Sequence, residues 1–239
     1  MTVFGAVFAR GGSKGVPGKN LREISGRSLL RIALDLGRSI KEIDRVFVST
    51  DSPEIADAAL SAGAEVPFLR PPEIATDIAP EWLAWQHLAR HLLECGASEI
   101  DTLISLPSTA PLRESEDVLS AIELFEASDF DLVLGVTESR SNPWFNLATR
   151  DEVGEVALVA HSLEQQFTRR QDAPQTFDIT TVVYVTSLGF ILRSSGLWSG
   201  KVGSITVPPE RAVDIDSEFD LRLAQSIWMA ERKGSRGRQ

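Results

Sequence analysis

The chain has 239 residues and a formal net charge of −10, an acidic balance that argues against nucleic acid as its main partner. The single cysteine excludes an intramolecular disulfide and favours a reducing compartment, so we expect a cytoplasmic location. No secretory leader is visible and no apolar run reaches about 18 residues, so we expect neither export nor a membrane span.

Strand-like and helix-like runs alternate along the chain. Apolar, β-rich runs predict strands at residues 3–8, 45–49, 66–69, 102–106, 132–136, 181–186 and 202–207. Apolar residues at helical spacing predict helices at residues 28–39, 53–62, 80–95, 115–127 and 218–233, and Ser115 is expected to cap the fourth. This alternation is typical of a doubly wound, Rossmann-like α/β fold, in which a mostly parallel sheet carries helices on both faces.

The pattern changes near Glu138. From residue 138 to about residue 180 the chain is polar, contains Asn142-Pro143 and Gly154, and shows no long helical run. We expect this stretch to leave the sheet as short antiparallel strands and loops. The whole chain, residues 1–239, is then one domain with a small excursion.

The strongest functional signal lies between the first predicted strand and the first predicted helix. This first loop (residues 9–20) reads Ala-Arg-Gly-Gly-Ser-Lys-Gly-Val-Pro-Gly-Lys-Asn. Glycines let backbone N–H groups approach a ligand, and Arg10, Lys14 and Lys19 add cations, so we expect the loop to bind phosphate. The spacing of its glycines differs from that of a P-loop, and the Gly-x-Gly of dinucleotide-binding loops is absent.

A second signal precedes the last predicted helix. Asp214 and Asp216 flank Ile215, and alternation in an extended segment places both carboxylates on one side with Ile215 facing the core. Two converging carboxylates near phosphate oxygens suit Mg²⁺, so we expect this acidic pair to hold that ion. Capping of the helix by Asp216 or Ser217 is the structural alternative, but capping requires only one such residue.

These stretches resemble the signatures of the acylneuraminate (CMP-sialic acid) cytidylyltransferase family, whose sheet is of the nucleotide-diphospho-sugar transferase type. The resemblance extends from Phe4 to Leu221. It rests on the first loop, Ser49-Thr50-Asp51, Leu69-Arg70-Pro71, residues 106–113 and Asp214-Ile215-Asp216. It implies a Mg²⁺-dependent transfer of CMP from CTP to the anomeric hydroxyl of an acidic 2-keto-3-deoxy sugar, with release of pyrophosphate.

The resemblance also implies roles for individual residues. Arg10, Lys19 and Asp214 would act in catalysis, and Asp214 and Asp216 would hold the metal. The residues implied to bind CTP are Ala9, Arg10, Gly12, Ser13, Lys19, Asn20, Arg70 and Ala79. Those implied to bind the sugar are Thr109, Arg170 and Tyr184. The excursion would complete the sugar site and support a homodimer.

Three positions depart from the pattern of the family, and all concern the sugar. Pro107 replaces a Gln that reaches the sugar in sialic acid synthetases, Phe145 stands where a Lys is sometimes found, and Asp178 begins a stretch that is usually Arg-x-Asn-Gly-Ala. The sequence therefore leaves the sugar open among sialic, legionaminic, pseudaminic and octulosonic acids. It also leaves open whether Asp214 or a group on the metal takes the proton of the acceptor. A non-catalytic nucleotide-binding protein is the alternative of another class, although it would be expected to lose Lys19 or the acidic pair.

Overall fold

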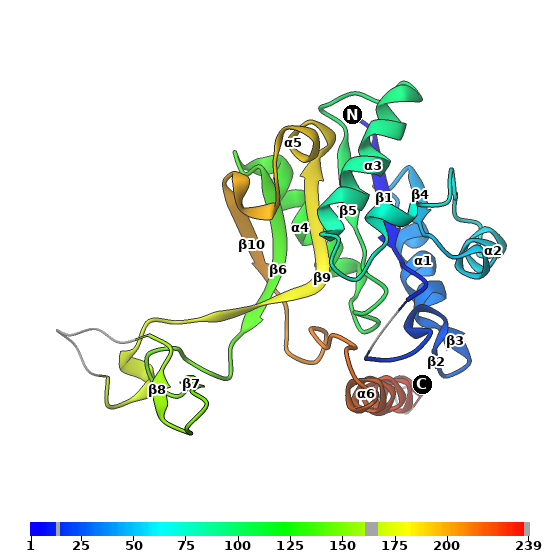
Figure 1. The fold of residues 1–239 in the computed structure, drawn as a ribbon. Coiled ribbons are helices and arrows are strands. Elements are labelled where there is room, and N and C mark those ends of the chain that lie inside the picture. Colours follow the sequence, from blue (N-terminus) through cyan, green and yellow to red (C-terminus); the bar gives the residue numbers. More distant parts are fainter. Residues whose placement is uncertain (13–14, 161–166, 237–239) are drawn as a thin grey trace.

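The computed structural model describes the chain except for residues 13–14, 161–166 and 237–239. A mixed sheet with the strand order β10-β6-β9-β5-β1-β4 forms the body of the described chain (Figure 1). Its strands are β1 (Val3–Phe8), β4 (Arg45–Ser49), β5 (Thr102–Ser105), β6 (Leu132–Glu138), β9 (Phe177–Ser187) and β10 (Val202–Thr206). The neighbours β1–β4, β1–β5 and β10–β6 pair in parallel, whereas β9 runs antiparallel to β5 and β6. The prediction of a mostly parallel sheet is confirmed, with one reversed strand.

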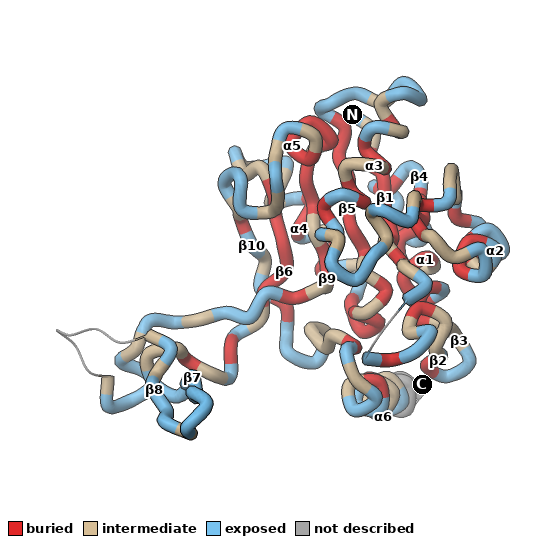
Figure 2. Tube along the Cα trace, in the orientation of Figure 1, coloured by how far each residue is buried: buried red, intermediate tan, exposed pale blue. Residues whose placement is uncertain are grey.

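The reversed strand follows from the excursion. Strand β6 continues to Glu138, which pairs with Phe177 at the start of β9, so the chain returns beside the strand that it left. Between them, an arm (residues 139–176) projects from the body at the lower left of Figure 1. It contains the short antiparallel strands β7 (Ala148–Arg150) and β8 (Val156–Leu158), as expected for the excursion. Figure 2 shows that most of the arm is exposed, whereas the strands of the body are buried.

Helices cover both faces of the sheet. Helices α1 (Leu29–Ser39), α2 (Pro53–Ser61) and α4 (Ser115–Ala127) supply apolar residues to the core on one face. Helices α3 (Glu81–Glu94) and α5 (Leu188–Arg193) do so on the other face. Helix α6 (Glu218–Arg236) lies beside the small hairpin of β2 (Glu23–Ile24) and β3 (Arg27–Ser28). None of the helices in the described chain has the length and apolarity needed to cross a membrane.

Three local predictions differ from the structure. Residues 66–69 form no strand, because Pro67 cannot donate to a ladder; only isolated bridges form, at Glu65 and Leu69. Glu114, not Ser115, caps α4, since its side chain accepts from the helix while Asp117 accepts from the Glu114 N–H at 2.9 Å. Helix α5 was not predicted, because a helix of 6 residues is too short to show a period.

Candidate functional site

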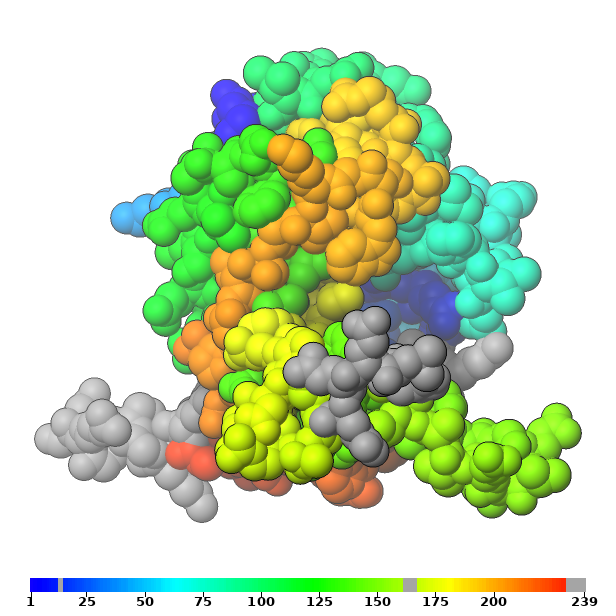
Figure 3. All heavy atoms as spheres, turned by 90° about the vertical axis from the view of Figure 1, so that its left-hand side faces the viewer, coloured from blue at the N-terminus to red at the C-terminus, as the bar shows by residue number. Residues whose placement is uncertain are grey.

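A cavity of about 730 Å³ opens where β1 and β5 end. Its lining comes from the first loop, from residues 70–85, from residues 107–109, from β9 and from residues 195–198. Figure 3 shows a recess between the body and the arm, with blue atoms of the N-terminal segment visible inside it. Ligands of open α/β sheets bind at this edge, so the structure gathers most of the predicted site residues where a ligand is expected.

Neighbouring side chains fix the start and the end of the first loop. Asp51 Oδ1 accepts the N–H of Gly11 at 2.9 Å. Asn20 Nδ2 donates to the Arg10 carbonyl at 2.9 Å, and its Oδ1 accepts from the Ser108 hydroxyl at 2.5 Å. These bonds leave the Arg10 guanidinium at the cavity, where it pairs with Asp77 at 2.6 Å. Asn20, predicted to bind CTP, therefore fixes the position of the first loop in this structure.

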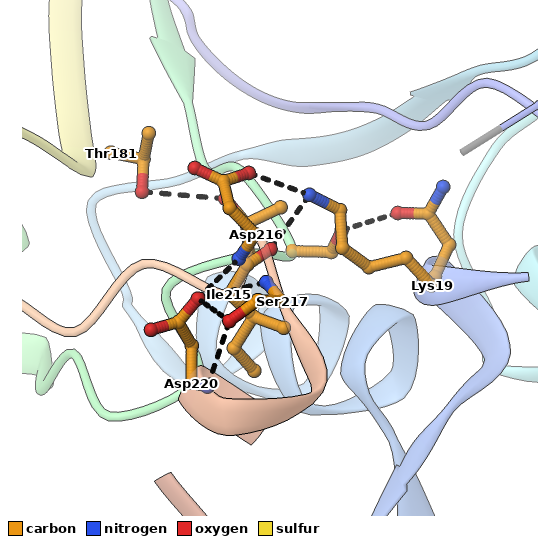
Figure 4. Close-up of polar contacts among 9 residues, drawn as sticks. Lys19, Thr181, Ile215, Asp216, Ser217 and Asp220 are labelled. Carbon is orange, nitrogen blue, oxygen red and sulfur yellow. Dashed lines mark hydrogen bonds and ion pairs between the residues drawn. The ribbon is translucent and has the colours of Figure 1, made fainter. Parts of the chain in front are cut away.

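Lys19 joins the first loop to the acidic pair. Its Nζ donates to the Ile215 carbonyl at 2.7 Å and lies 3.1 Å from Asp216 Oδ1, as Figure 4 shows. The side chain of Lys19 is 16% exposed, and that of Asp216 is 77% exposed. A Cβ on Gly15 would lie only 2.1 Å from the Asp216 carbonyl oxygen, so this close approach requires a glycine. The loop and the acidic pair thus face each other at one end of the cavity.

Asp214 lies on the inner side of the same segment. Ile215 is fully buried beside Val16 and Leu221, whereas the side chain of Asp216 is exposed. Asp214 Oδ1 is buried and has no hydrogen-bond partner among the described residues. Burial raises the pKa of the Asp214 carboxyl, and the charge of Asp216 adds to this rise. Nearby hydroxyls of Thr109 and Thr181 act in the opposite direction and favour the carboxylate.

The acidic pair fits a divalent ion. No group of three or more metal-ligating side chains is gathered within residues 1–12, 15–160 and 167–236. Mg²⁺ at a nucleotide site, however, uses one or two carboxylates together with phosphate oxygens and water. Asp214 provides a buried oxygen that lacks a partner in the described chain, and Asp216 provides an open one. This donor set is the kind that Mg²⁺ prefers.

The other predicted CTP-binding residues occupy different positions. Arg70 is buried and lines the cavity, where its guanidinium donates to the Ser49 hydroxyl at 3.2 Å and to the Ser49 carbonyl at 2.5 Å. Ala79 also lines the cavity. Ala9 is buried below the loop, with its N–H donated to the Ser49 carbonyl at 3.0 Å. Gly12 is exposed. Ser13 and Lys14 lie outside the described residues.

The predicted sugar-binding residues do not all meet. Thr109 and Tyr184 line the cavity. Arg170 lies in the arm, in the 3-10 turn Arg170–Asp172, where it donates to the Ser139 carbonyl and lines a separate hollow. Within one copy of the chain, the structure therefore does not bring Arg170 to the other two residues.

Sequence reasoning missed an aromatic wall of the cavity, formed by Phe8, Trp85 and Tyr184, and the carboxylate of Glu81. Trp85 stacks on Phe8 with ring centroids 5.6 Å apart and meets the edge of Tyr184 at 5.7 Å. Burial, followed by the nearby charge of Glu81, raises the pKa of Tyr184 to about 12. Glu81 lines the same cavity and accepts the indole N–H of Trp85 at 2.9 Å. The helical spacing of Trp82 and Trp85 was the available signal, because it places both on the side of α3 that faces the sheet.

Arg113 is a buried cation next to two segments that line the cavity. It is 5% exposed, and it donates to the Ala110 carbonyl at 3.0 Å and to the Val182 carbonyl at 2.7 Å. Desolvation lowers its pKa to about 9, while the charges of Asp117 and Asp214 oppose this shift. The guanidinium therefore ties the loop that carries Thr109 to the reversed strand β9.

Comparison with known proteins gives a consistent result. A family model described as cytidylyltransferase matches residues 5–189. The chain is 33% identical over 221 residues to post-translational flagellin modification protein B of Campylobacter coli, with 92% of both chains covered. It is 32% identical over 221 residues to CMP-N,N′-diacetyllegionaminic acid synthase of Campylobacter jejuni, again with 92% of both covered. In fold it is similar to CMP:2-keto-3-deoxy-manno-octonic acid synthetase complexed with CTP, at a TM-score of 0.71, 13% identity and coverage of 97% and 100%. The matched family confirms the family that the motifs predicted.

Proposed function

Because this enzyme belongs to the cytidylyltransferase family, we propose that its nucleotide substrate is CTP and that its acceptor is an acidic 2-keto-3-deoxy sugar. The reaction transfers CMP to the anomeric hydroxyl of a sialic acid-like nonulosonic acid and releases pyrophosphate. The contact between Lys19 and the Asp214–Asp216 segment carries this proposal, because it puts a cation and the Asp216 carboxylate side by side in the lining of a single cavity, with the buried Asp214 two residues away. A triphosphate with its divalent ion requires both kinds of group side by side.

The cations of the first loop would act on the leaving group. Arg10 is paired with Asp77 and Lys19 with Asp216, so each is already held at the cavity before a ligand arrives. When the bond to the α-phosphorus breaks, negative charge grows on pyrophosphate, and fixed cations stabilise it without reorganisation. Removing one such donor typically costs about 2.7–4 kcal/mol of transition-state stabilisation.

The acidic pair would hold Mg²⁺, which when bound supplies neutralisation of charge on the phosphate oxygens. Asp214 also interacts with the hydroxyls of Thr109 and Thr181. We call the side of the cavity proposed to bind the sugar the acceptor wall; it consists of Thr109, Thr181, Pro107, Trp85 and Tyr184. We propose that Asp214 orients the acceptor hydroxyl by accepting its hydrogen bond. In-line placement of that hydroxyl is then a matter of positioning, which supplies a large part of the rate in such transfers.

The acceptor wall favours a sugar with apolar substituents. Pro107 offers no side-chain hydrogen bond at the cavity, and Trp85 and Tyr184 present rings to it. Aromatic rings contribute apolar contact area to such pockets. The relative from Campylobacter jejuni is named for N,N′-diacetyllegionaminic acid, a sugar with two acetyl groups, which supports acceptors of this type. We therefore propose legionaminic acids ahead of sialic acid.

We also propose that two copies of the chain associate through the arm. Large apolar side chains are exposed along it and at the strand ends that enter it. They are Phe145, Leu147, Val153, Val156, Val159, Phe177 and Ile179. Contiguous exposed apolar surface marks interaction sites. In a dimer, the second copy would contribute its own Arg170 to the region of the interface. A cytoplasmic location is part of the proposal, supported by Cys95 as a free cysteine.

The deciding experiment is pyrophosphate release from CTP and Mg²⁺ across a panel of 2-keto-3-deoxy sugar acids. We expect release with at least one nonulosonic acid and its near-complete loss in Lys19→Ala. Lys41→Ala is the control, because Lys41 is an exposed lysine distant from the cavity lining. Absence of release over the whole panel, together with no binding of CTP, would refute the proposal.

A further inference from the structure

The acidic pair lies in a long connection, residues 207–217, that runs from β10 to α6 in the lower part of Figure 1. Every residue of this connection is described, and none of them belongs to a helix or a strand. When both carboxylates of the acidic pair are ionised, they repel each other. Contacts outside the pair must therefore hold the connection in place if both carboxylates are to bind one ion.

The second half of the connection is tied to the body. The Ile215 N–H donates to the Thr109 carbonyl at 2.9 Å, and the Ile215 carbonyl accepts from Lys19 at 2.7 Å. The first turn of the connection bonds to itself instead, since the Arg211 N–H donates to the Pro208 carbonyl at 3.0 Å. Such a turn shapes the chain locally and does not attach it to the body.

The guanidinium of Arg211 makes this attachment. It donates to Asp117 Oδ1 at 2.8 Å and to Glu114 Oε2 at 3.1 Å, both at the start of α4. Asp117 is only 3% exposed, and its other oxygen accepts the Glu114 N–H at 2.9 Å. Exposed ion pairs constrain a structure little, whereas a buried carboxylate that is bonded through both oxygens has a fixed position. Arg211 is therefore held by a rigid partner.

The start of α4 also carries part of the acceptor wall. Thr109 lies in the loop that leads into α4, and Arg113 ties that loop to β9. Arg211 thus connects the segment of the acidic pair to the helix end that follows the Thr109 loop. Compensation of the buried charge of Asp117 is the structural alternative for Arg211, and it would affect stability alone.

We propose that Arg211 is a positioning residue, which holds the acidic pair in the arrangement that binds the divalent ion of the nucleotide. This inference rests on the proposed function. In it Arg211 touches neither the ion nor a substrate, and it acts through the connection that carries Asp214 and Asp216. Residues outside the ligand set that orient metal ligands typically change metal affinity by about 10–100-fold when they are replaced. Loss of Arg211 should therefore weaken the contribution of Mg²⁺ to nucleotide binding in a protein that remains folded.

The test is calorimetric titration with CTP, without sugar, once with Mg²⁺ and once with a chelator in its place. The ratio of the two dissociation constants, the magnesium gain, measures how well the acidic pair holds the ion. We expect a gain of more than about tenfold in the unmodified protein, and its loss in Asp216→Ala, which removes a ligand. Arg211→Met should lower the gain by about tenfold, while the affinity measured without Mg²⁺ stays the same. Arg211→Lys should fall between the two, because a lysine keeps the charge but not the two-pronged donor.

Arg45→Met is the matched control. It breaks an ion pair of a half-exposed arginine with Glu65, in which the charged atoms are 2.6 Å apart. Arg45 begins β4, at the opposite edge of the sheet from β10, and it lies outside the cavity lining. Its loss should leave the magnesium gain at the value of the unmodified protein.

Three results would contradict these expectations, and they have different meanings. If Arg211→Met keeps the full magnesium gain, or loses affinity equally with and without Mg²⁺, the inference is overturned while the proposed function stands. If Arg211→Met does not fold, Arg211→Lys decides: it should still lose about threefold of the gain or more, and a full gain overturns the inference. An unchanged gain in Asp216→Ala, or no binding of CTP to the unmodified protein, would instead refute the proposed function.

Discussion

Replacing Gly15 with alanine should lower the rate of catalysis far more than enzyme unfolding alone can explain. The added Cβ would lie 2.1 Å from the carbonyl oxygen of Asp216. A carbon and an oxygen need about 3.4 Å, so the first loop or the acidic pair must move by about 1.3 Å. A Cβ is fixed to the main chain of residue 15, and the Asp216 carbonyl is itself main chain, so a change of side-chain rotamer cannot relieve the contact. The shift acts directly on the groups that hold the triphosphate and the divalent ion in the proposed function.

The expected loss can be put on a scale. A misplacement of about 1 Å in a catalytic site costs roughly 10²-fold in rate, equivalent to about 2.7 kcal/mol of transition-state stabilisation. Gly15 is exposed in a loop, but its added Cβ meets main chain, and overpacking of this kind typically costs about 1–3 kcal/mol of stability. We therefore expect kcat/KM for pyrophosphate release to fall roughly 100-fold in Gly15→Ala. The thermal midpoint should fall by several degrees, and an assay well below it still measures folded enzyme.

The assay is continuous pyrophosphate release with CTP varied at saturating sugar, alongside thermal unfolding followed by circular dichroism. Gly96→Ala is the matched control. Gly96 has a φ of 95° with no atom within 4 Å of an added Cβ, and it lies outside the cavity lining. It should lose some stability through backbone strain and retain its activity. A Gly15→Ala enzyme within threefold of the unmodified kcat/KM would show that the close approach of loop and acidic pair is not needed.

Four further outcomes are expected. Lys19→Ala should lower kcat by about 10²–10³-fold with the fold kept, and a loss under threefold in steady-state kinetics would contradict the role of its charge. Asp216→Ala should abolish turnover at every Mg²⁺ concentration. It should not lower the thermal midpoint, since this side chain is 77% exposed. Activity that returns with excess Mg²⁺ would mean that another residue binds the ion. Val156→Asp, on the exposed arm, should convert the proposed dimer into a monomer in light scattering, and a variant that keeps the mass of a dimer would place the interface elsewhere. Glu81→Gln should raise the thermal midpoint at neutral pH, because the pKa of Glu81 is raised in the folded state and its ionised form therefore costs stability. That gain should vanish as the pH falls through the folded and then the unfolded pKa, whereas a gain that persists at low pH would have another cause.

That the first loop lies next to the acidic pair could be predicted from the ligand that both segments were expected to bind, although they are far apart in the sequence. Lys19 and Asp216 are 197 positions apart, yet a triphosphate with a divalent ion needs both kinds of group. Parallel strands also bring the loops that follow them to one edge of a sheet. Most strands and helices could be placed for a simpler reason, since their apolar periods are long and uninterrupted. The strand predicted at residues 66–69 was wrong, because the proline in this otherwise apolar run has no N–H for a ladder.

The direction of β9 could not be predicted, and the position of Arg170 depended on it. A buried run such as residues 182–185 has the same apolar pattern whichever way it points. The strand extends from Phe177, next to the arm, to Ser187 in the body, and the seven steps of extended chain from Phe177 to Tyr184 span about 23 Å. The residues before β9 are therefore carried away from the cavity. Arg170, placed by its sequence distance from Tyr184, lies in the arm for this reason.

Glu81 escaped prediction because a glutamate at the start of a helix is ordinary. Its position becomes informative only when tertiary structure shows what surrounds it. Strand β9 contributes Tyr184 to the same cavity, and α3 brings Trp85 between Tyr184 and Phe8. The carboxyl then lies in a desolvated environment that no local pattern encodes.

The reversed strand also explains the buried charge of Arg113. Because β9 runs antiparallel beside β5, it presents Thr181 next to Thr109, with their hydroxyl oxygens 3.3 Å apart. The hydroxyl contact alone would let these two segments separate by a few tenths of an ångström. Arg113 prevents this by donating to a carbonyl on each side, and a guanidinium with a pKa of about 9 is still charged at neutral pH. A charge-assisted bond to each carbonyl therefore holds Thr109 beside Thr181, and the in-line transfer proposed above would require such fixed positions.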